Sequence, residues 1–223
     1  VKAEFLVNQF ISFNQRTPQV AALKDGGFVV AWVSEQQRVV APAAGTNTAM
    51  VAYNSVVNPS VDIYARVFQP NGSALGGEFV VNTGSAPCAN PSVAAGSDGK
   101  FMLAWSVRDT TQFTNGWDVC ARSFGTNGIG GALVMVNQHI EGNQFAPKLS
   151  CLGTDYLMVW TSLVQDGSRE GVFGRLLRGD GTPFSDEFRV NTTTASQQMQ
   201  PAVADDGLSQ FSVVWTSFIG EPN

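Results

Sequence analysis

Apolar residues are concentrated in short segments along this chain, and each segment is bounded by Gly, Pro, Asn or Asp. The clearest segments end in tryptophan and read GFVVAW, KFMLAW, YLMVW and FSVVW. Their length and their β-branched and aromatic residues predict strands. Alternate side chains of a strand point to opposite sides of its sheet, and here both sets are apolar. Both faces of each sheet must therefore be covered.

The tryptophan segments belong to a longer unit that recurs about every 55 residues. Each segment follows a short strand that contains a proline (PQVA, PSVA, PKLS or PAVA) and a turn with Gly or Asp. A third strand (DIYARVF, DVCARSF or GVFGRLL), a glycine turn and a fourth strand ending in Val-Asn come next. The pattern predicts an all-β fold, a β-propeller built from repeated four-stranded antiparallel blades that stack to bury their faces.

The repeat defines one domain, residues 1–223, with units at approximately 9–82, 83–137, 138–191 and 192–223. The first unit carries a long insertion, 35–61, which we expect to cover an adjacent blade or to bind a partner. The last unit lacks its third strand, and residues 1–8 are a candidate for its fourth. We expect a partial propeller, an excerpt of a longer one, because a ring of so few blades leaves open edges.

The consensus of the units is P-x-V-A, D-G-x-F-V-V-x-W, D-x-x-A-R-x-F and E-F-x-V-N. It resembles repeats of large secreted bacterial surface proteins, and its strand order is similar to that of TolB-type propellers. The resemblance covers nearly the whole chain. It implies the fold and says little about activity, because propellers carry many functions.

The composition predicts where the protein works. Charged residues make up 14% of the chain, against roughly 25% in typical soluble domains, so Asn, Gln, Ser and Thr must keep it in solution. This is typical of extracellular or cell-surface proteins. The net charge of −5 and the scattered Lys and Arg argue against nucleic acid as a partner. No apolar run is long enough to insert into a membrane.

Cysteines and sequons leave several possibilities open. Three cysteines allow one disulfide and a free thiol, three buried thiols, or a bond to another chain. They are Cys88, Cys120 and Cys151. Asn71 and Asn191 stand in glycosylation sequons and would carry glycans in a eukaryotic source.

Two sets of recurring residues are predicted to belong to the scaffold. The tryptophans fit a core between blades better than a ligand-stacking platform; they are Trp32, Trp105, Trp160 and Trp215. The third-strand arginines are expected to bond to backbone carbonyls or acids and to lie flat between blades, with an anion site as the alternative. They are Arg66, Arg122 and Arg175.

Three candidate ligand-binding glutamines lie in the loops that join fourth strands to first strands, and aromatic residues are expected on the same face. These loops emerge on the same face as the long insertion. Amides beside exposed aromatic rings suit a neutral carbohydrate, because rings stack on sugars and amides bond to hydroxyls. The candidates are Phe13, Gln15, Phe113, Trp117, Gln144, Phe145 and Gln198.

The sequence offers few groups for catalysis or metal binding. His139 is the only histidine, so a Ser-His-Asp triad or a zinc site lacks parts. The Asp-Gly turns supply too few oxygens for a calcium loop. We therefore expect no cofactor and no metal. A carboxylate pair for glycoside hydrolysis remains open; the acids on the insertion face are Glu35, Asp109, Glu141, Asp166 and Glu170.

Together these patterns predict a non-enzymatic extracellular module with a structural or adhesive role. Its expected partners are other protein chains or surface glycans, within a larger assembly or beside additional blades. The first alternative is a lectin-like, carbohydrate-binding propeller, and the second is a fragment of a glycoside-processing enzyme.

Overall fold

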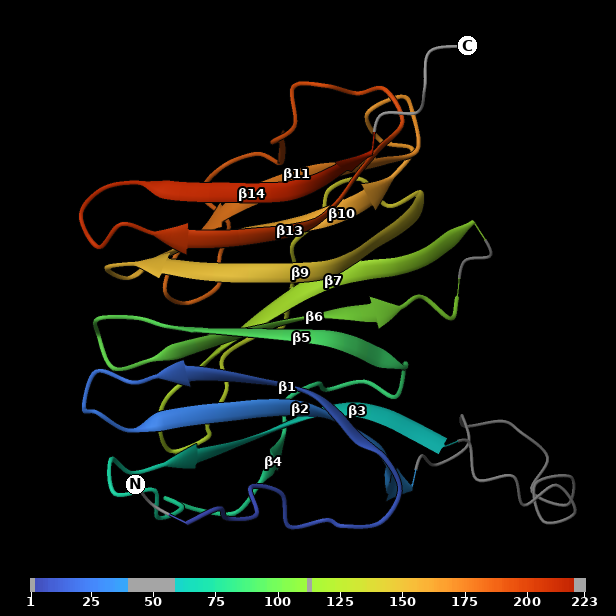
Figure 1. Cartoon of the computed structure of the whole chain (residues 1–223). Coiled ribbons are helices and arrows are strands. Elements are labelled where there is room, and N and C mark those ends of the chain that lie inside the picture. The colour runs from blue at the N-terminus through green and yellow to red at the C-terminus, as the bar shows by residue number, and fades with distance from the viewer. Residues whose placement is uncertain (1–2, 40–58, 112–113, 219–223) are drawn as a thin grey trace, which may run out of the picture.

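The computed structural model describes residues 3–39, 59–111 and 114–218 of the chain. Every regular element in these residues is a β-strand (Figure 1). Within the same residues there is no helix with the length and hydrophobicity needed to cross a bilayer. The all-β prediction is confirmed.

The strands form three complete four-stranded blades and one half blade. The first blade contains β1 (Gln15–Ala22), β2 (Phe28–Val39), β3 (Pro59–Phe68) and β4 (Phe79–Val80). The second contains β5 (Cys88–Ala95), β6 (Phe101–Arg108), β7 (Asn115–Phe124) and β8 (Val134–Met135). The third contains β9 (Gly142–Leu152), β10 (Asp155–Leu163), β11 (Glu170–Leu177) and β12 (Phe188–Arg189), and the half blade contains β13 (Gln197–Asp205) and β14 (Phe211–Phe218).

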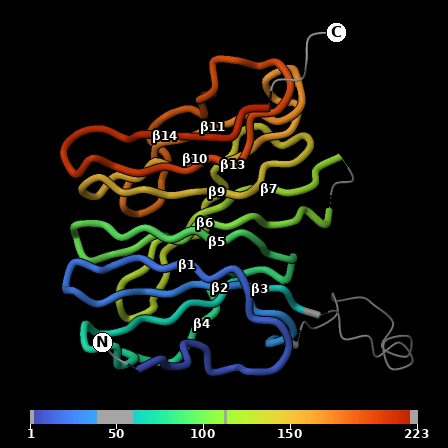
Figure 2. The backbone as a smooth tube through the Cα atoms, in the orientation of Figure 1, coloured from blue at the N-terminus to red at the C-terminus, as the bar shows by residue number. Residues whose placement is uncertain are grey.

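Within a blade, each strand pairs antiparallel with the next one in sequence. The first strands of consecutive blades, β1, β5, β9 and β13, are neighbours, so the blades stack in chain order (Figures 1 and 2). This arrangement matches the predicted stacking of repeat units.

The core lies between the blades, because each complete sheet is apolar on both faces. One buried cluster joins the first and second blades and includes Val33, Ile63 and Trp105. A second cluster joins the second and third blades and includes Met102 and Trp160. The strand β6 contributes alternate residues to both clusters, as the doubly apolar pattern predicts.

The outer face of the half blade is less well covered than the faces between the complete blades. Val214 on β14 is 66% exposed, whereas the residues at its position in the complete blades are fully buried. These residues are Ala31, Ala104 and Val159.

Each first strand contains a bulge that the sequence did not predict. The residue before its proline has a left-handed backbone, and the pairing register shifts at this point. The φ angles are 52° at Thr17, 52° at Asn90, 54° at Ala146 and 55° at Gln200. Because non-glycine residues rarely adopt this conformation, its presence in all four units marks the bulge as part of the repeat.

The long insertion is shorter than predicted, because strands extend into it from both sides. β2 continues to Val39, and β3 begins at Pro59. Residues 40–58 lie outside the described residues. That they cover a blade or bind a partner therefore stays a prediction.

Candidate functional site

An asparagine at the end of each fourth strand organises one end of its blade. Its side-chain oxygen accepts a hydrogen bond from a third-strand N–H: Asn82 from Ile63 at 2.9 Å, Asn137 from Val119 at 2.9 Å and Asn191 from Val172 at 2.8 Å. Its amide nitrogen donates to a carboxylate in every case. The three blades differ in what surrounds this carboxylate.

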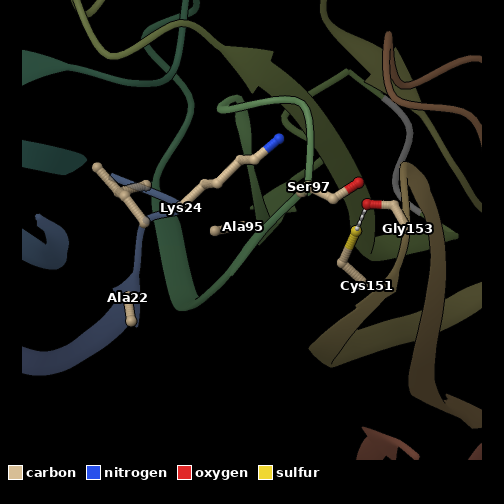
Figure 3. Close-up of a pocket in the computed structure, with 8 residues that line it drawn as sticks. Ala22, Lys24, Ala95, Ser97, Cys151 and Gly153 are labelled. Atoms are coloured by element: carbon tan, nitrogen blue, oxygen red, sulfur yellow. Dashed lines mark hydrogen bonds between the residues drawn. The ribbon is translucent and has the colours of Figure 1, made fainter. Parts of the chain in front are cut away.

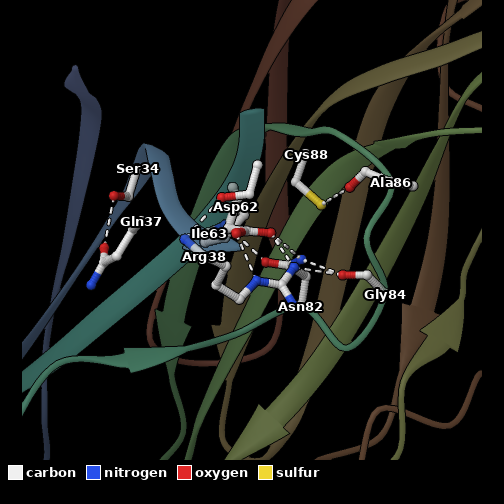
Figure 4. Close-up of polar contacts among 10 residues, drawn as sticks. Ser34, Gln37, Arg38, Asp62, Ile63, Asn82, Gly84, Ala86 and Cys88 are labelled. Carbon is white, nitrogen blue, oxygen red and sulfur yellow. Dashed lines mark hydrogen bonds and ion pairs between the residues drawn. The ribbon is translucent and has the colours of Figure 1, made fainter. Parts of the chain in front are cut away.

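In the first blade the carboxylate is neutralised by an arginine (Figure 4). Asp62 is 1% exposed and accepts a bond from Asn82 Nδ2 at 2.8 Å. Arg38 donates from Nε to Asp62 Oδ2 at 2.7 Å and from Nη2 to Asp62 Oδ1. This bond to Asp62 is the main cause that raises the pKa of Arg38. A charge-assisted, two-point contact of this kind holds the carboxylate and the guanidinium in a defined geometry.

In the second blade no Lys or Arg among the described residues pairs with the carboxylate, Asp118. Asp118 Oδ1 accepts from Asn137 Nδ2 at 2.7 Å, and Asp118 Oδ2 accepts from Asn115 Nδ2 at 3.0 Å. Asn115 Nδ2 also lies 3.0 Å from Asp109 Oδ2, so one amide holds two carboxylates together. Burial raises the pKa of Asp118, and the nearby charge of Asp109 adds to the rise.

In the third blade the carboxylate comes from the loop. Gly171 replaces the aspartate of the third strand, and Asp166 accepts from Asn191 Nδ2 at 3.0 Å instead. A Cβ atom at Gly171 would lie 2.8 Å from Asp166 Oδ2. The loop carboxylate therefore fills the space of the missing side chain.

The second blade also departs from the others in how it meets its neighbour. β7 pairs in parallel with β9, with Asn115 opposite Gly142 and Trp117 opposite Asn143. The side chain of Asn143 lies over Gly116, where a Cβ atom would be 2.1 Å from its Oδ1. We call Asp109, Asn115, Trp117, Asp118 and Asn143 the β7–β9 junction.

The junction contains a buried polar atom without a partner. Asn115 is 8% exposed, and its Oδ1 has no hydrogen-bond partner among the described residues. Asp109 is partly exposed, while Asp118 lies buried behind the shared amide. The arrangement therefore combines a carboxylate that solvent can reach, a buried carboxyl with a raised pKa, and an unused acceptor.

Sequence reasoning found part of this junction. Trp117 and Asp109 were candidates, but Asn115, Asp118 and Asn143 were missed. Asp118 looked like a consensus residue of the repeat. The signal that could have drawn attention to it is the aligned Gly171, which shows that this position is not uniform.

The remaining predicted ligand residues are scattered. Phe13 is 61% exposed and stacks on Phe10 with ring centroids 6.4 Å apart. Phe145 on β9 is half-buried, and Phe113 lies outside the described residues. Gln15 Oε1 accepts the indole N–H of Trp32 at 3.0 Å, which ties this amide to the core.

Gln144 and Gln198 do not reach a ligand surface. Both are fully buried, and each donates to a backbone carbonyl three residues earlier, at 2.9 Å and 2.8 Å. The prediction that these amides face a sugar is therefore wrong: strands β9 and β13 begin before them and turn their side chains inward.

Trp105 and Trp160 lie between blades, each in a buried cluster that joins two neighbouring blades. Trp32, Trp105 and Trp160 are 4%, 1% and 0% exposed, and Trp215 in the half blade is only partly buried. Trp32 is therefore buried, although it belongs to neither of the two clusters between blades.

The recurring arginines bond to backbone carbonyls outside their own blade. Arg66 Nη1 donates to Val7 O at 2.9 Å, Arg122 Nη1 to Val81 O at 3.0 Å, and Arg175 Nη1 to Val136 O at 2.8 Å. Each acceptor is the valine of a Val-Asn pair: Val81 and Val136 directly follow β4 and β8, and Val7 lies in the segment before β1. We call these bonds the arginine latches.

The two sequons differ in accessibility. Asn71 is exposed, and its Oδ1 accepts a bond from Ser73 N. Asn191 is 2% exposed and uses its amide within the blade. Asn191 is therefore not available for a glycan in this fold, which corrects the prediction for this site.

All three cysteines are free thiols. Burial raises the pKa of Cys88 to about 12 and that of Cys151 to about 11, and it raises the pKa of Cys120 strongly. A thiol with so high a pKa is a poor nucleophile at neutral pH.

Two hollows lie at the other end of the blades from the β7–β9 junction, near the turns between first and second strands. One has a volume of about 300 Å³ and is bordered by Lys24, Ser97 and Cys151 (Figure 3). The other, of about 550 Å³, is lined by Asp98, Lys100, Arg178 and neighbours. In the described part of the chain no three His, Cys, Asp or Glu side chains converge as a metal site would require. The two hollows therefore offer mixed charge and small residues rather than a convergent site.

The sequence matches no protein-family profile and no curated protein. Solved structures do match its fold. An α-L-arabinanase of Penicillium chrysogenum in complex with arabinobiose is 15% identical with a TM-score of 0.57, and the alignment covers 88% of this chain and 57% of that one. An α-L-arabinofuranosidase of Fusarium graminearum with an iminosugar inhibitor is 14% identical with a TM-score of 0.60, covering 94% and 61%.

A thermostable family-43 glycoside hydrolase is 10% identical with a TM-score of 0.54, covering 90% of this chain and 65% of that one. The chain thus spans about three fifths of the length of these structures. The similarity confirms the β-propeller fold and agrees with a partial propeller. The finer prediction of a TolB-like blade order stays a prediction.

These findings correct the functional prediction. We expected a non-enzymatic structural or adhesive module, but the three similar structures named above are glycoside hydrolases. The main sequence-based interpretation is therefore overturned.

Proposed function

We propose that this chain is part of a glycoside-processing β-propeller and that the β7–β9 junction contacts the sugar. The observation that carries the proposal is the pair of carboxylates on one amide, Asp109 and Asp118, each 3.0 Å from Asn115 Nδ2. Glycoside hydrolysis uses two carboxyl groups, one of which must hold a proton, and a raised pKa favours that protonated state.

The other residues of the junction suit the same ligand. Trp117 is half-buried at the edge of β7 and offers an aromatic surface. Asn143 stands opposite it on β9. An aromatic ring beside amides is a common way to bind a neutral sugar. Surface glycans, which the sequence already suggested as partners, are thus the substrate class we propose, and an extracellular location remains part of the proposal.

The proposal can be tested by hydrolysis. The purified chain would be assayed with arabinobiose and with an aryl α-L-arabinofuranoside, because the similar structures were solved with such sugars or inhibitors. We expect Asp109→Asn to lower kcat/KM by at least about 100-fold, the scale of losing an acid–base group. Asp155→Asn is the matched control. Asp155 is an exposed carboxylate that lines the hollow of about 550 Å³, at the other end of the blades from the junction.

Binding separates two outcomes. A chain that binds arabinobiose by calorimetry without hydrolysing it, and that loses binding on Trp117→Ala, would favour a glycan-binding propeller. If the chain neither binds nor hydrolyses any of these sugars, or if both aspartate variants behave alike, the proposal is wrong.

A further inference from the structure

Four Val-Asn pairs recur at the unit boundaries of the chain, and arginine latches are formed at the first three of them. Val7, Val81 and Val136 each accept an arginine from the following blade, at 2.9, 3.0 and 2.8 Å. Val190 is the next valine in a Val-Asn pair at the end of a fourth strand. None of the three latching arginines reaches its carbonyl, because each is bonded to an earlier valine.

The third strand, which carries the latching arginine, pairs with the second strand in the same register in every complete blade. Arg66 pairs with Val30, Arg122 with Leu103, and Arg175 with Met158. Each partner stands two residues before the tryptophan of its strand. In β14 the equivalent residue is Val213, two residues before Trp215.

The outer edge of β14 is unpaired in the described part of the chain. β13 and β14 form a sheet of two strands, whereas every other blade adds a third strand at this edge. The exposed apolar side chains beside it include Phe218, 62% exposed, as well as Val214. An unpaired strand edge with apolar side chains is a template for an additional strand.

We propose that the free edge of β14 binds a β-strand with the third-strand sequence of this repeat, D-x-x-A-R-x-F. The strand adds antiparallel, with its arginine opposite Val213 and its guanidinium on the carbonyl of Val190. The occupant is defined by this chemistry because the interface continues the three that already exist. The inference is independent of the proposed glycosidase activity.

A peptide of this chain's own third strand is a direct probe. Residues 61–68 (VDIYARVF) would be synthesised with a lysine tail for solubility and titrated into the ¹⁵N-labelled full chain. We expect amide shifts along β14 and at Val190. In the first blade Val61 pairs with Glu35, whose equivalent in β14 is Phe218. A nitroxide at the peptide's N-terminus should therefore broaden Phe218 and leave Phe211 sharp.

The arginine latch is tested by one substitution in the peptide. Replacing the residue that corresponds to Arg66 by Ala should weaken binding about tenfold or more, the usual scale for a hydrogen bond from a charged group. The control is a chain carrying Val20→Lys on β1 of the first blade, far from β14. It should bind the original peptide with unchanged affinity.

Four results would overturn the inference. They are no shift at saturating peptide, equal affinity of the Ala peptide, broadening at Phe211 instead of Phe218, and a chain that dimerises through β14 and excludes the peptide. The last result would identify a second copy as the occupant.

Discussion

The first and second blades hold a buried aspartate at the same place and surround it differently. Asp62 sits against the guanidinium of Arg38, whereas Asp118 has two amides and a second carboxylate, Asp109, as its neighbours. The same strand position therefore carries a fixed ion pair in one blade and a carboxyl with a raised pKa in the other. The difference shows that the repeat fixes where the carboxylate lies and the neighbouring loop decides its chemistry.

The third blade supports this division of roles. Asp166 reaches the same asparagine from the loop when the strand has Gly171. The carboxylate is thus kept even where its position in the sequence changes, because the amide of the fourth-strand asparagine is buried and needs an acceptor.

The largest effect is expected for Arg38→Ala. The substitution leaves Asp62 buried without its cation, and breaking a buried ion pair in this way costs about 3 kcal/mol or more. Urea denaturation should show the free energy of unfolding falling by this amount. The control is Arg16→Ala, which removes the more exposed pair with Glu35, at 2.8 Å and with Arg16 45% exposed. This loss should stay below about 1 kcal/mol. Similar losses would contradict the assigned role of Arg38.

A smaller effect is expected for Gly171→Ala in the third blade. The new Cβ would lie 2.8 Å from Asp166 Oδ2 and push that carboxylate away from Asn191. Overpacking of this kind costs about 1–3 kcal/mol, which thermal unfolding can measure.

The double variant Asp166→Ala/Gly171→Asp is the matched test. It rebuilds in the third blade the arrangement of the second, with the carboxylate on the strand. We expect it to recover most of the stability lost by Gly171→Ala. If the double variant is less stable than Gly171→Ala alone, the loop carboxylate does not substitute for the strand aspartate.

The fold could be predicted from the sequence because it depends on periodic burial. The spacing of Trp105, Trp160 and Trp215 and the apolar residues on both faces of their strands define stacked sheets. The insertion was overestimated, since the strand β2 continues through polar residues as far as Val39. Polar residues in a strand give no apolar alternation to read, so its end was not visible in the sequence.

The candidate site was harder to predict because it depends on contacts between blades. Gln144 was assigned to a loop, yet β9 begins at Gly142 and pairs with β7. This parallel pairing joins residues of different units, and no local pattern reports it. The left-handed residue before each proline was missed for a similar reason, since Thr, Asn, Ala and Gln share no preference for that conformation.

The smallest effect, and the most direct test of the comparison, is the titration of individual carboxyl groups. Burial raises the pKa of Asp118 above the ordinary aspartate value, whereas bonds from Arg16 and Asn14 lower the pKa of Glu35 below the ordinary glutamate value. An unperturbed aspartate titrates below an unperturbed glutamate. We expect NMR detection of the carboxyl carbons to show Asp118 displaced upward and Glu35 displaced downward.

These shifts have opposite consequences for stability. The contribution of Asp118 is present below its unfolded pKa and is lost as the pH rises through its higher folded pKa, because the folded state prefers the protonated form. The contribution of Glu35 is present above its unfolded pKa and is lost as the pH falls through its lower folded pKa. Denaturation between pH 3 and 7 should therefore change in opposite directions for Asp118→Asn and Glu35→Gln relative to the unaltered chain. An Asp118 that titrates below the ordinary aspartate value would remove the distinction between the first and second blades, and with it the case for the β7–β9 junction as a site of proton transfer.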